Sequence, residues 1–162
     1  MIFTFCRKLT LILFLLPFAV KAQSGLLMLH GKVVSNMQSL DEVRVEVISS
    51  ENDTLWDFMT PRNGSYKVNV PLGKVYTIEF YKEGYFKKAV GVMGFSIQDT
   101  IEQVSGRYFY QLDIEVLPNN TDEKPIVIPP VAKLYIKDPE KGITYDKQYV
   151  KWVQDEYEEL TE

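Results

Sequence analysis

The sequence contains very little of the chemistry that active sites use most. It has one cysteine, Cys6, and one histidine, His30, in 162 residues. A zinc site with two or more imidazole ligands and a conventional Cys-His pair are therefore excluded. No glycine-rich phosphate loop, G-x-S-x-G stretch or EF-hand spacing occurs in the chain. We therefore expect no catalytic residue, no metal site and no cofactor, and we interpret the protein as a non-enzyme.

Long apolar runs are also scarce, with one exception near the N-terminus. Two basic residues precede Leu9 to Val20, an apolar run of about a dozen residues that is shorter than the ~20 residues of a membrane span. Val20-Lys21-Ala22 then resembles an A-x-A cleavage site. These features predict a signal peptide over residues 1–22, with cleavage near Ala22 and a periplasmic or secreted mature chain. The alternative is an uncleaved N-terminal anchor.

Positive charge becomes scarce once this segment is removed. The segment carries three basic residues and no acidic ones, so 18 basic residues fall to 15 against 22 acidic ones, a net charge of −7. This charge argues against nucleic acid or an anionic membrane surface as a partner. Cys6 also leaves with the segment, so the mature chain has neither a disulfide nor a lipid-acceptor cysteine. We expect it to be held together by packing alone.

What the sequence does contain is an alternation of apolar and polar residues from Leu26 to Val116. Seven short runs of this kind, separated by turn residues such as Asn63-Gly64, predict an antiparallel β-sandwich over residues 26–116. His30 falls opposite Leu29 in the first run, so we expect a solvent-exposed side chain. The inward phase of the clearest runs predicts a core that includes Val45, Val47, Tyr66, Val68, Ile78, Phe80, Leu112 and Ile114.

The character of the chain changes after Val116. Residues 117–130 contain four prolines and predict an extended linker. Residues 131–162 predict a C-terminal extension of one strand and one amphipathic helix, which Asp146 can cap. Residues at spacings of three and four form an apolar stripe on this helix: Tyr149, Trp152, Val153, Tyr157 and Leu160.

The stripe on the C-terminal helix allows two interpretations. If the helix packs on its own sandwich, the stripe is part of the core. If it does not, the stripe is an exposed anchor for another protein, because buried Trp and Tyr carry much of the binding energy at interfaces. We take these five residues as the candidate partner-binding site.

Four stretches that follow one another in order resemble the carboxypeptidase regulatory-like family of transthyretin-like β-sandwiches. The family's usual turn has an acidic residue before glycine, whereas Arg62-Asn63 precede Gly64 here. The resemblance covers about Leu27 to Val116 and implies a seven-stranded Ig/transthyretin-like sandwich of the kind found as non-catalytic modules in bacterial envelope proteins. The stretches are GKVVS (31–35), VRVEVIS (43–49), TPRNGSYKVNVPLG (60–73) and YTIEFYKEGY (76–85).

Together these features predict a non-catalytic periplasmic or cell-envelope binding or scaffold protein that acts through protein-protein contacts. The alternative is a carbohydrate-binding or surface-adhesion β-sandwich, because sandwiches carry such sites and the chain has ten tyrosines. An exposed coplanar set of Tyr or Trp would favour the alternative. A hydrolase remains possible only if a cleft gathers carboxylates that are scattered in the sequence.

Overall fold

The computed structural model of the protein describes residues 25–93, 106–119, 129–138 and 140–161. The predicted signal peptide and most of the predicted linker lie outside these residues. The elements are β1 (Leu26–Ser35), β2 (Gln38–Ser39), β3 (Arg44–Ser49), β4 (Thr54–Met59), β5 (Ser65–Pro71), β6 (Val75–Tyr81), β7 (Lys88–Met93), β8 (Arg107–Gln111), β9 (Ile114–Glu115), β10 (Ala132–Asp138), β11 (Gly142–Tyr145) and α1 (Lys147–Thr161).

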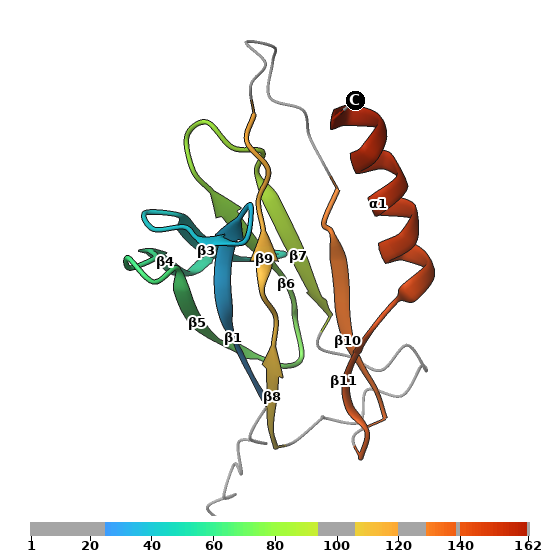
Figure 1. Ribbon diagram of the computed structural model, residues 1–162. Helices are drawn as coiled ribbons and strands as arrows, with labels where there is room; N and C mark the ends of the chain where they lie inside the picture. Colours follow the sequence, from blue (N-terminus) through green and yellow to red (C-terminus); the bar gives the residue numbers. More distant parts are fainter. Residues whose placement is uncertain (1–24, 94–105, 120–128, 139, 162) are drawn as a thin grey trace, which may run out of the picture.

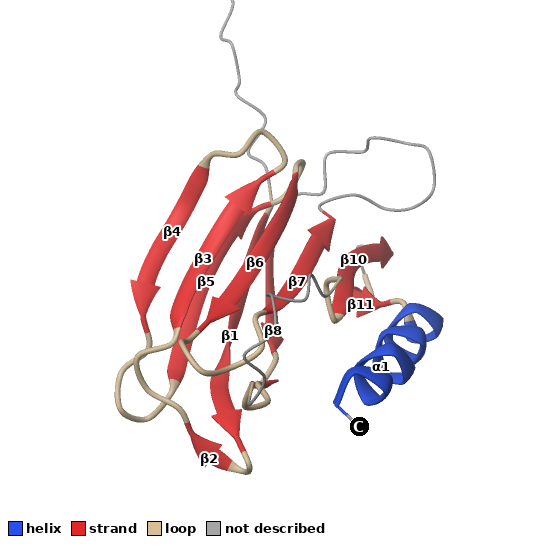
Figure 2. Ribbon diagram, turned by 90° about the horizontal axis from the view of Figure 1, so that it is seen from above, coloured by secondary structure: helices blue, strands red, loops and turns tan. Residues whose placement is uncertain are grey.

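The strands form two sheets, so the predicted β-sandwich is confirmed. In the first sheet, β1 pairs with β5, with β8 and β9, and with the short strand β2. The second sheet has the order β11-β10-β7-β6-β3-β4. The edge strand β4 lies at one side of the molecule and α1 at the other (Figure 2). Among the described residues between 26 and 116, seven strands have five residues or more, as predicted, and two more have only two residues.

The pairing differs from the prediction in one respect, because three strand pairs are parallel. β8 and β9 both run parallel to β1, and β10 runs parallel to β7. The pairing of β10 with β7 brings the predicted C-terminal strand into the six-stranded sheet (Figure 1). Leu134 and Ile136 of β10 are 1% and 0% exposed and belong to the same buried cluster as the valines of β3. The strand is thus part of the sandwich rather than an appendage to it.

The predicted core is buried, with one exception. Tyr66 and Phe80 pack edge to face across the two sheets, with ring centroids 5.0 Å apart. Leu112 is only partly buried, because it lies in the irregular link between β8 and β9 instead of within a strand. His30 is exposed, as predicted. The predicted residues that are buried are Val45, Val47, Tyr66, Val68, Ile78, Phe80 and Ile114.

A close crossing places the link between β8 and β9 against β1. The Leu112 carbonyl accepts a hydrogen bond of 2.6 Å from the Tyr66 hydroxyl, and the Lys32 N–H donates to Asp113 Oδ1 at 2.8 Å. Gly31 makes the crossing possible, since a Cβ atom there would collide with the Leu112 carbonyl oxygen. These contacts hold the link between β8 and β9 against β1, so that β9 can pair with the second half of β1.

The turn before β5 has the geometry that Asn63-Gly64 predicts. Gly64 has a φ of 66°, which favours glycine, and Asn63 Oδ1 accepts hydrogen bonds from the Ser65 N–H and hydroxyl.

A hydrogen bond also joins the two sheets at the side opposite α1. Trp56 of β4 donates its Nε1–H to the Asn69 carbonyl of β5 at 2.9 Å. This bond joins the edge strands of the two sheets.

Candidate binding site at helix α1

Helix α1 begins at Lys147, directly after Asp146, the residue that the sequence predicts as its cap. Asp146 Oδ1 accepts hydrogen bonds from the N–H groups of Gln148 at 2.9 Å and Tyr149 at 3.1 Å. These are two of the four N–H groups that the first turn of a helix leaves without a helical partner. The cap therefore fixes where the helix starts.

The helix packs against its own sandwich through one part of its stripe. Val153 is 1% exposed, and Val150 is half-buried. Lys133 of β10 places its Nζ atom 4.0 Å from the centroid of the Tyr149 ring, a distance at which a cation is attracted to the ring face. Tyr149 is half-buried, and burial raises the pKa of its hydroxyl.

Another part of the stripe remains in contact with solvent. The Trp152 side chain is 48% exposed, and its ring centroid lies 5.7 Å from that of Tyr149. The structure thus separates three of the five predicted residues, with Val153 buried against the sandwich, Tyr149 half-buried and Trp152 exposed. Tyr157 and Leu160 lie within α1, but their side chains are outside the described part of the chain.

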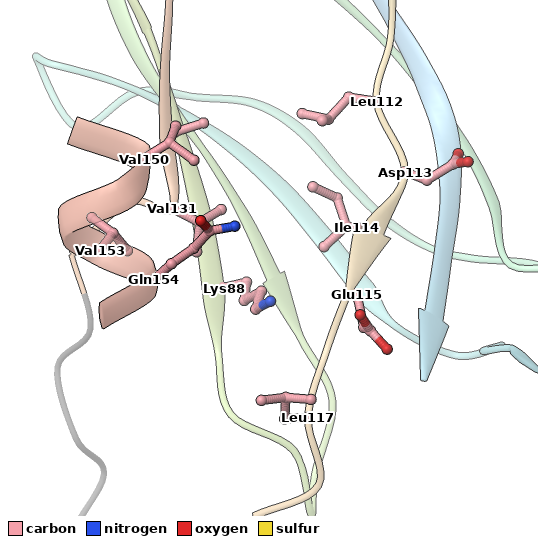
Figure 3. A pocket seen from close by; sticks show the side chains of 11 residues that line it. Lys88, Leu112, Asp113, Ile114, Glu115, Leu117, Val131, Val150, Val153 and Gln154 are labelled. Atoms are coloured by element: carbon pink, nitrogen blue, oxygen red, sulfur yellow. The ribbon is translucent and has the colours of Figure 1, made fainter. Parts of the chain in front are cut away.

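A groove of about 520 Å³ lies between α1 and the edge strand β9 (Figure 3). Aliphatic side chains from both sides line it, including Val150 of the helix and Leu117 beyond β9. Lys88 of β7 also lines the groove. Burial lowers the pKa of the Lys88 ammonium group, and the Glu115 carboxylate of β9 opposes this shift by favouring the charged form.

The sequence analysis missed Lys88 and this groove. A signal was present, since Lys88 shares the inward phase of Val90 and Val92, which are buried in β7. The run from Phe86 to Met93 has no clear alternation of its own, because Ala89 and Val90 are both apolar neighbours. The sequence therefore does not indicate which side of this strand faces inward. The opposite wall comes from a helix about 60 positions further along the chain, which no local pattern connects to β7.

The groove does not gather carboxylates in the way a hydrolase requires. Asp113 and Glu115 both line it, but Asp113 is directed toward β1 (Figure 3), where its Oδ1 accepts the Lys32 N–H. Catalytic acid-base pairs need two carboxyl groups that converge on one substrate bond.

Two other kinds of feature are absent from the described part of the chain. Within these residues, no three His, Cys, Asp or Glu side chains lie close enough together to hold a metal ion. No helix in the described ranges is both long and apolar enough to cross a membrane.

Comparison with known proteins gives only distant similarity in structure. The sequence matches no family model and no curated protein. Catechol 1,2-dioxygenase from Acinetobacter sp. ADP1 has a TM-score of 0.46 at 12% identity, over 73% of this chain and 60% of that one. A DUF3823 family protein from Parabacteroides merdae has a TM-score of 0.40 at 15% identity, over 70% and 53%.

The pilus 2b backbone protein of group B streptococcus is a third structure of this kind. Its TM-score is 0.38 at 12% identity, over 57% of this chain and 41% of that one. The chain therefore covers less than two thirds of each of these three structures. At such values the similarities carry no argument about family or function.

Proposed function

We propose that this protein is a non-catalytic β-sandwich of the bacterial cell envelope that binds another envelope protein through the exposed part of helix α1. The location rests on the signal peptide that the sequence predicts for residues 1–22, after which the mature chain would be periplasmic or secreted. The absence of enzymatic activity rests on the single histidine and on the carboxylates of the groove, which do not converge.

The resemblance to carboxypeptidase regulatory-like modules supports the same proposal. The four stretches that carry it fall on both sheets of the sandwich: on β1 and β5 in one sheet and on β3 and β6 in the other. In such modules the sandwich is a rigid support and the binding residues are added to it. Here the added element is α1, which is the only helix among the described residues.

One observation carries the choice of surface: α1 packs on the sandwich, yet Trp152, its largest aromatic side chain, is still exposed to solvent. Val153 is 1% exposed and is buried where the helix meets the sandwich, whereas Trp152 is 48% exposed. A large aromatic ring on a fixed element can bind a partner without the entropy cost of ordering a flexible segment. The Trp152 ring is therefore positioned before any partner arrives.

Replacing Trp152 with alanine tests this function. We expect the W152A variant to lose capture of its partner from an envelope extract, while its melting temperature stays within about 2 °C of the parent. The matched control is Met59→Ala, which removes a side chain that is 60% exposed on β4, at the far side of the sandwich. A lower melting temperature with capture intact would return Trp152 to the core and contradict the proposal.

The alternative is a carbohydrate-binding or surface-adhesion sandwich. A flat aromatic platform on α1 would favour it, but the rings of Tyr149 and Trp152 are inclined to each other by 50°. If capture by the parent yields sugar polymer and no protein, and W152A abolishes this capture, the alternative replaces our proposal at this helix.

A further inference from the structure

The outer face of the five-stranded sheet carries a group of exposed basic residues on an otherwise acidic protein. Because side chains alternate along a strand, the residues next to the buried positions of β1, β5 and β8 point to solvent. The register places Lys67 beside His30, and Phe109 one step from Gln111 on the neighbouring strand. We call this surface the basic face and define it by His30, Lys32, Lys67, Arg107, Phe109 and Gln111, all of which are exposed.

The cations of this face differ from those of the other sheet in their partners. On the six-stranded sheet, Arg44 forms an ion pair of 2.8 Å with Asp57, and Lys87 forms one of 2.6 Å with Glu79. Within the described ranges, Lys32, Lys67 and Arg107 have no carboxylate at ion-pair distance. The Asp113 carboxylate lies beside the main chain of Lys32, where it accepts the Lys32 N–H, so the cations of this face that stand clear of it are Lys67 and Arg107.

Phe109 adds an apolar contact to this charge. Its side chain is 66% exposed and lies beside the half-buried Met28 on β1. The register places Arg107 opposite Leu26, six positions before Lys32 on β1, which corresponds to about 20 Å along the strand. Along the strand direction, the exposed Phe109 ring thus lies between Arg107 on β8 and the two lysines, Lys32 on β1 and Lys67 on β5.

We propose that the basic face binds an acidic polysaccharide, a chain of sugar rings that carry carboxylates. The apolar face of a sugar ring can lie on Phe109 while the carboxylates of neighbouring sugars approach Arg107 and Lys67. The opposite charges supply attraction and the ring contact supplies the preference for a sugar chain. This surface is separate from α1, so the proposal does not depend on the function proposed for Trp152.

An acidic protein segment fits the basic face less well. Peptides add to sheets at a strand edge through main-chain hydrogen bonds, whereas the side chains of the basic face project from the flat face of the sheet around β1, which is paired on both sides by β5 and by β8 and β9. Protein interfaces also depend on large side chains that enter pockets. A flat face with charge and one open ring suits the repeated rings of a sugar polymer better.

The test uses polygalacturonate and the same polymer with its carboxyl groups methyl-esterified, which has the same sugar chain without the negative charge. We expect the protein to bind polygalacturonate at low salt in calorimetric titration, and to bind the esterified polymer at least tenfold more weakly. Phe109→Ala and Lys67→Gln should each weaken binding by about fivefold, the upper range for one exposed contact. The control is Lys74→Gln, which removes an exposed lysine paired with Glu51 away from this face.

Three results would overturn the proposal. These are no binding of polygalacturonate by the parent, equal binding of the esterified polymer, and a loss in the Lys74→Gln variant as large as that in Lys67→Gln. Poly-L-glutamate tests the acidic-protein interpretation: binding as tight as that of polygalacturonate and unaffected by Phe109→Ala would replace the polysaccharide with an acidic polypeptide. Trp152→Ala should leave polygalacturonate binding unchanged, so the two proposed functions can fail separately.

Discussion

Tyr66 is the residue at which the two sheets and the link between β8 and β9 come together. Its ring packs against Phe80, and its hydroxyl donates to the Leu112 carbonyl at 2.6 Å. Burial raises the pKa of this hydroxyl, and the negative charge of Asp113 raises it further. The tyrosine therefore stabilises the fold only while it keeps its proton.

Replacing Tyr66 with phenylalanine should reveal this dependence on pH. At about pH 8 the variant should lose ~1 kcal/mol of unfolding free energy, the typical value of one hydrogen bond. Above about pH 10 an unfolded tyrosine ionises while the folded one does not, so the parent loses stability as the pH rises and the variant lacks this loss. Urea unfolding at both pH values should therefore show a smaller difference at high pH. A difference that grows with pH would contradict this account.

At the scale of elements, α1 depends on its cap and on Val153, the deeply buried residue among its described side chains. Replacing Asp146 with alanine removes the acceptor for the N–H groups of Gln148 and Tyr149, and caps of this kind contribute ~1 kcal/mol. We expect thermal unfolding to show a loss of that order and circular dichroism to show less helix. Asp146→Asn keeps an acceptor at the same position and serves as the control. If the two variants lose stability equally, charge at the helix N-terminus rather than the hydrogen bonds is responsible.

At the scale of the whole molecule, β10 of the C-terminal region shares one buried core with the sandwich. Leu134 of β10 is 1% exposed and belongs to the same cluster as Val90 and Val92 of β7. Replacing it with alanine should cost about 2–5 kcal/mol, as for other large-to-small changes in a core. Because the cluster is continuous, calorimetry should show one transition at a lower temperature. A separate early transition, with the main one unchanged, would show instead that residues 131–161 unfold independently.

The amino-acid sequence by itself determined the local structure of this protein. Alternation in β3, β5 and β6 predicts strands and the buried positions Val45, Val68 and Ile78, because a side chain's face in a strand depends only on its neighbours. Asp146 predicts the start of α1 for the same reason, since the cap bonds to residues two and three positions away. The candidate residues of the stripe were also visible in the sequence, as was the exposure of His30.

Only the tertiary structure decided which segments lie side by side. The parallel pairing of β8 with β1 and of β10 with β7 joins residues far apart in the chain, and no local pattern specifies such partners. The same packing buries Val153 while leaving Trp152 exposed, and it aligns Lys67 and Phe109 on one face from strands about 40 positions apart. Both proposed binding surfaces depend on these long-range pairings, because a surface needs residues that the chain path brings together.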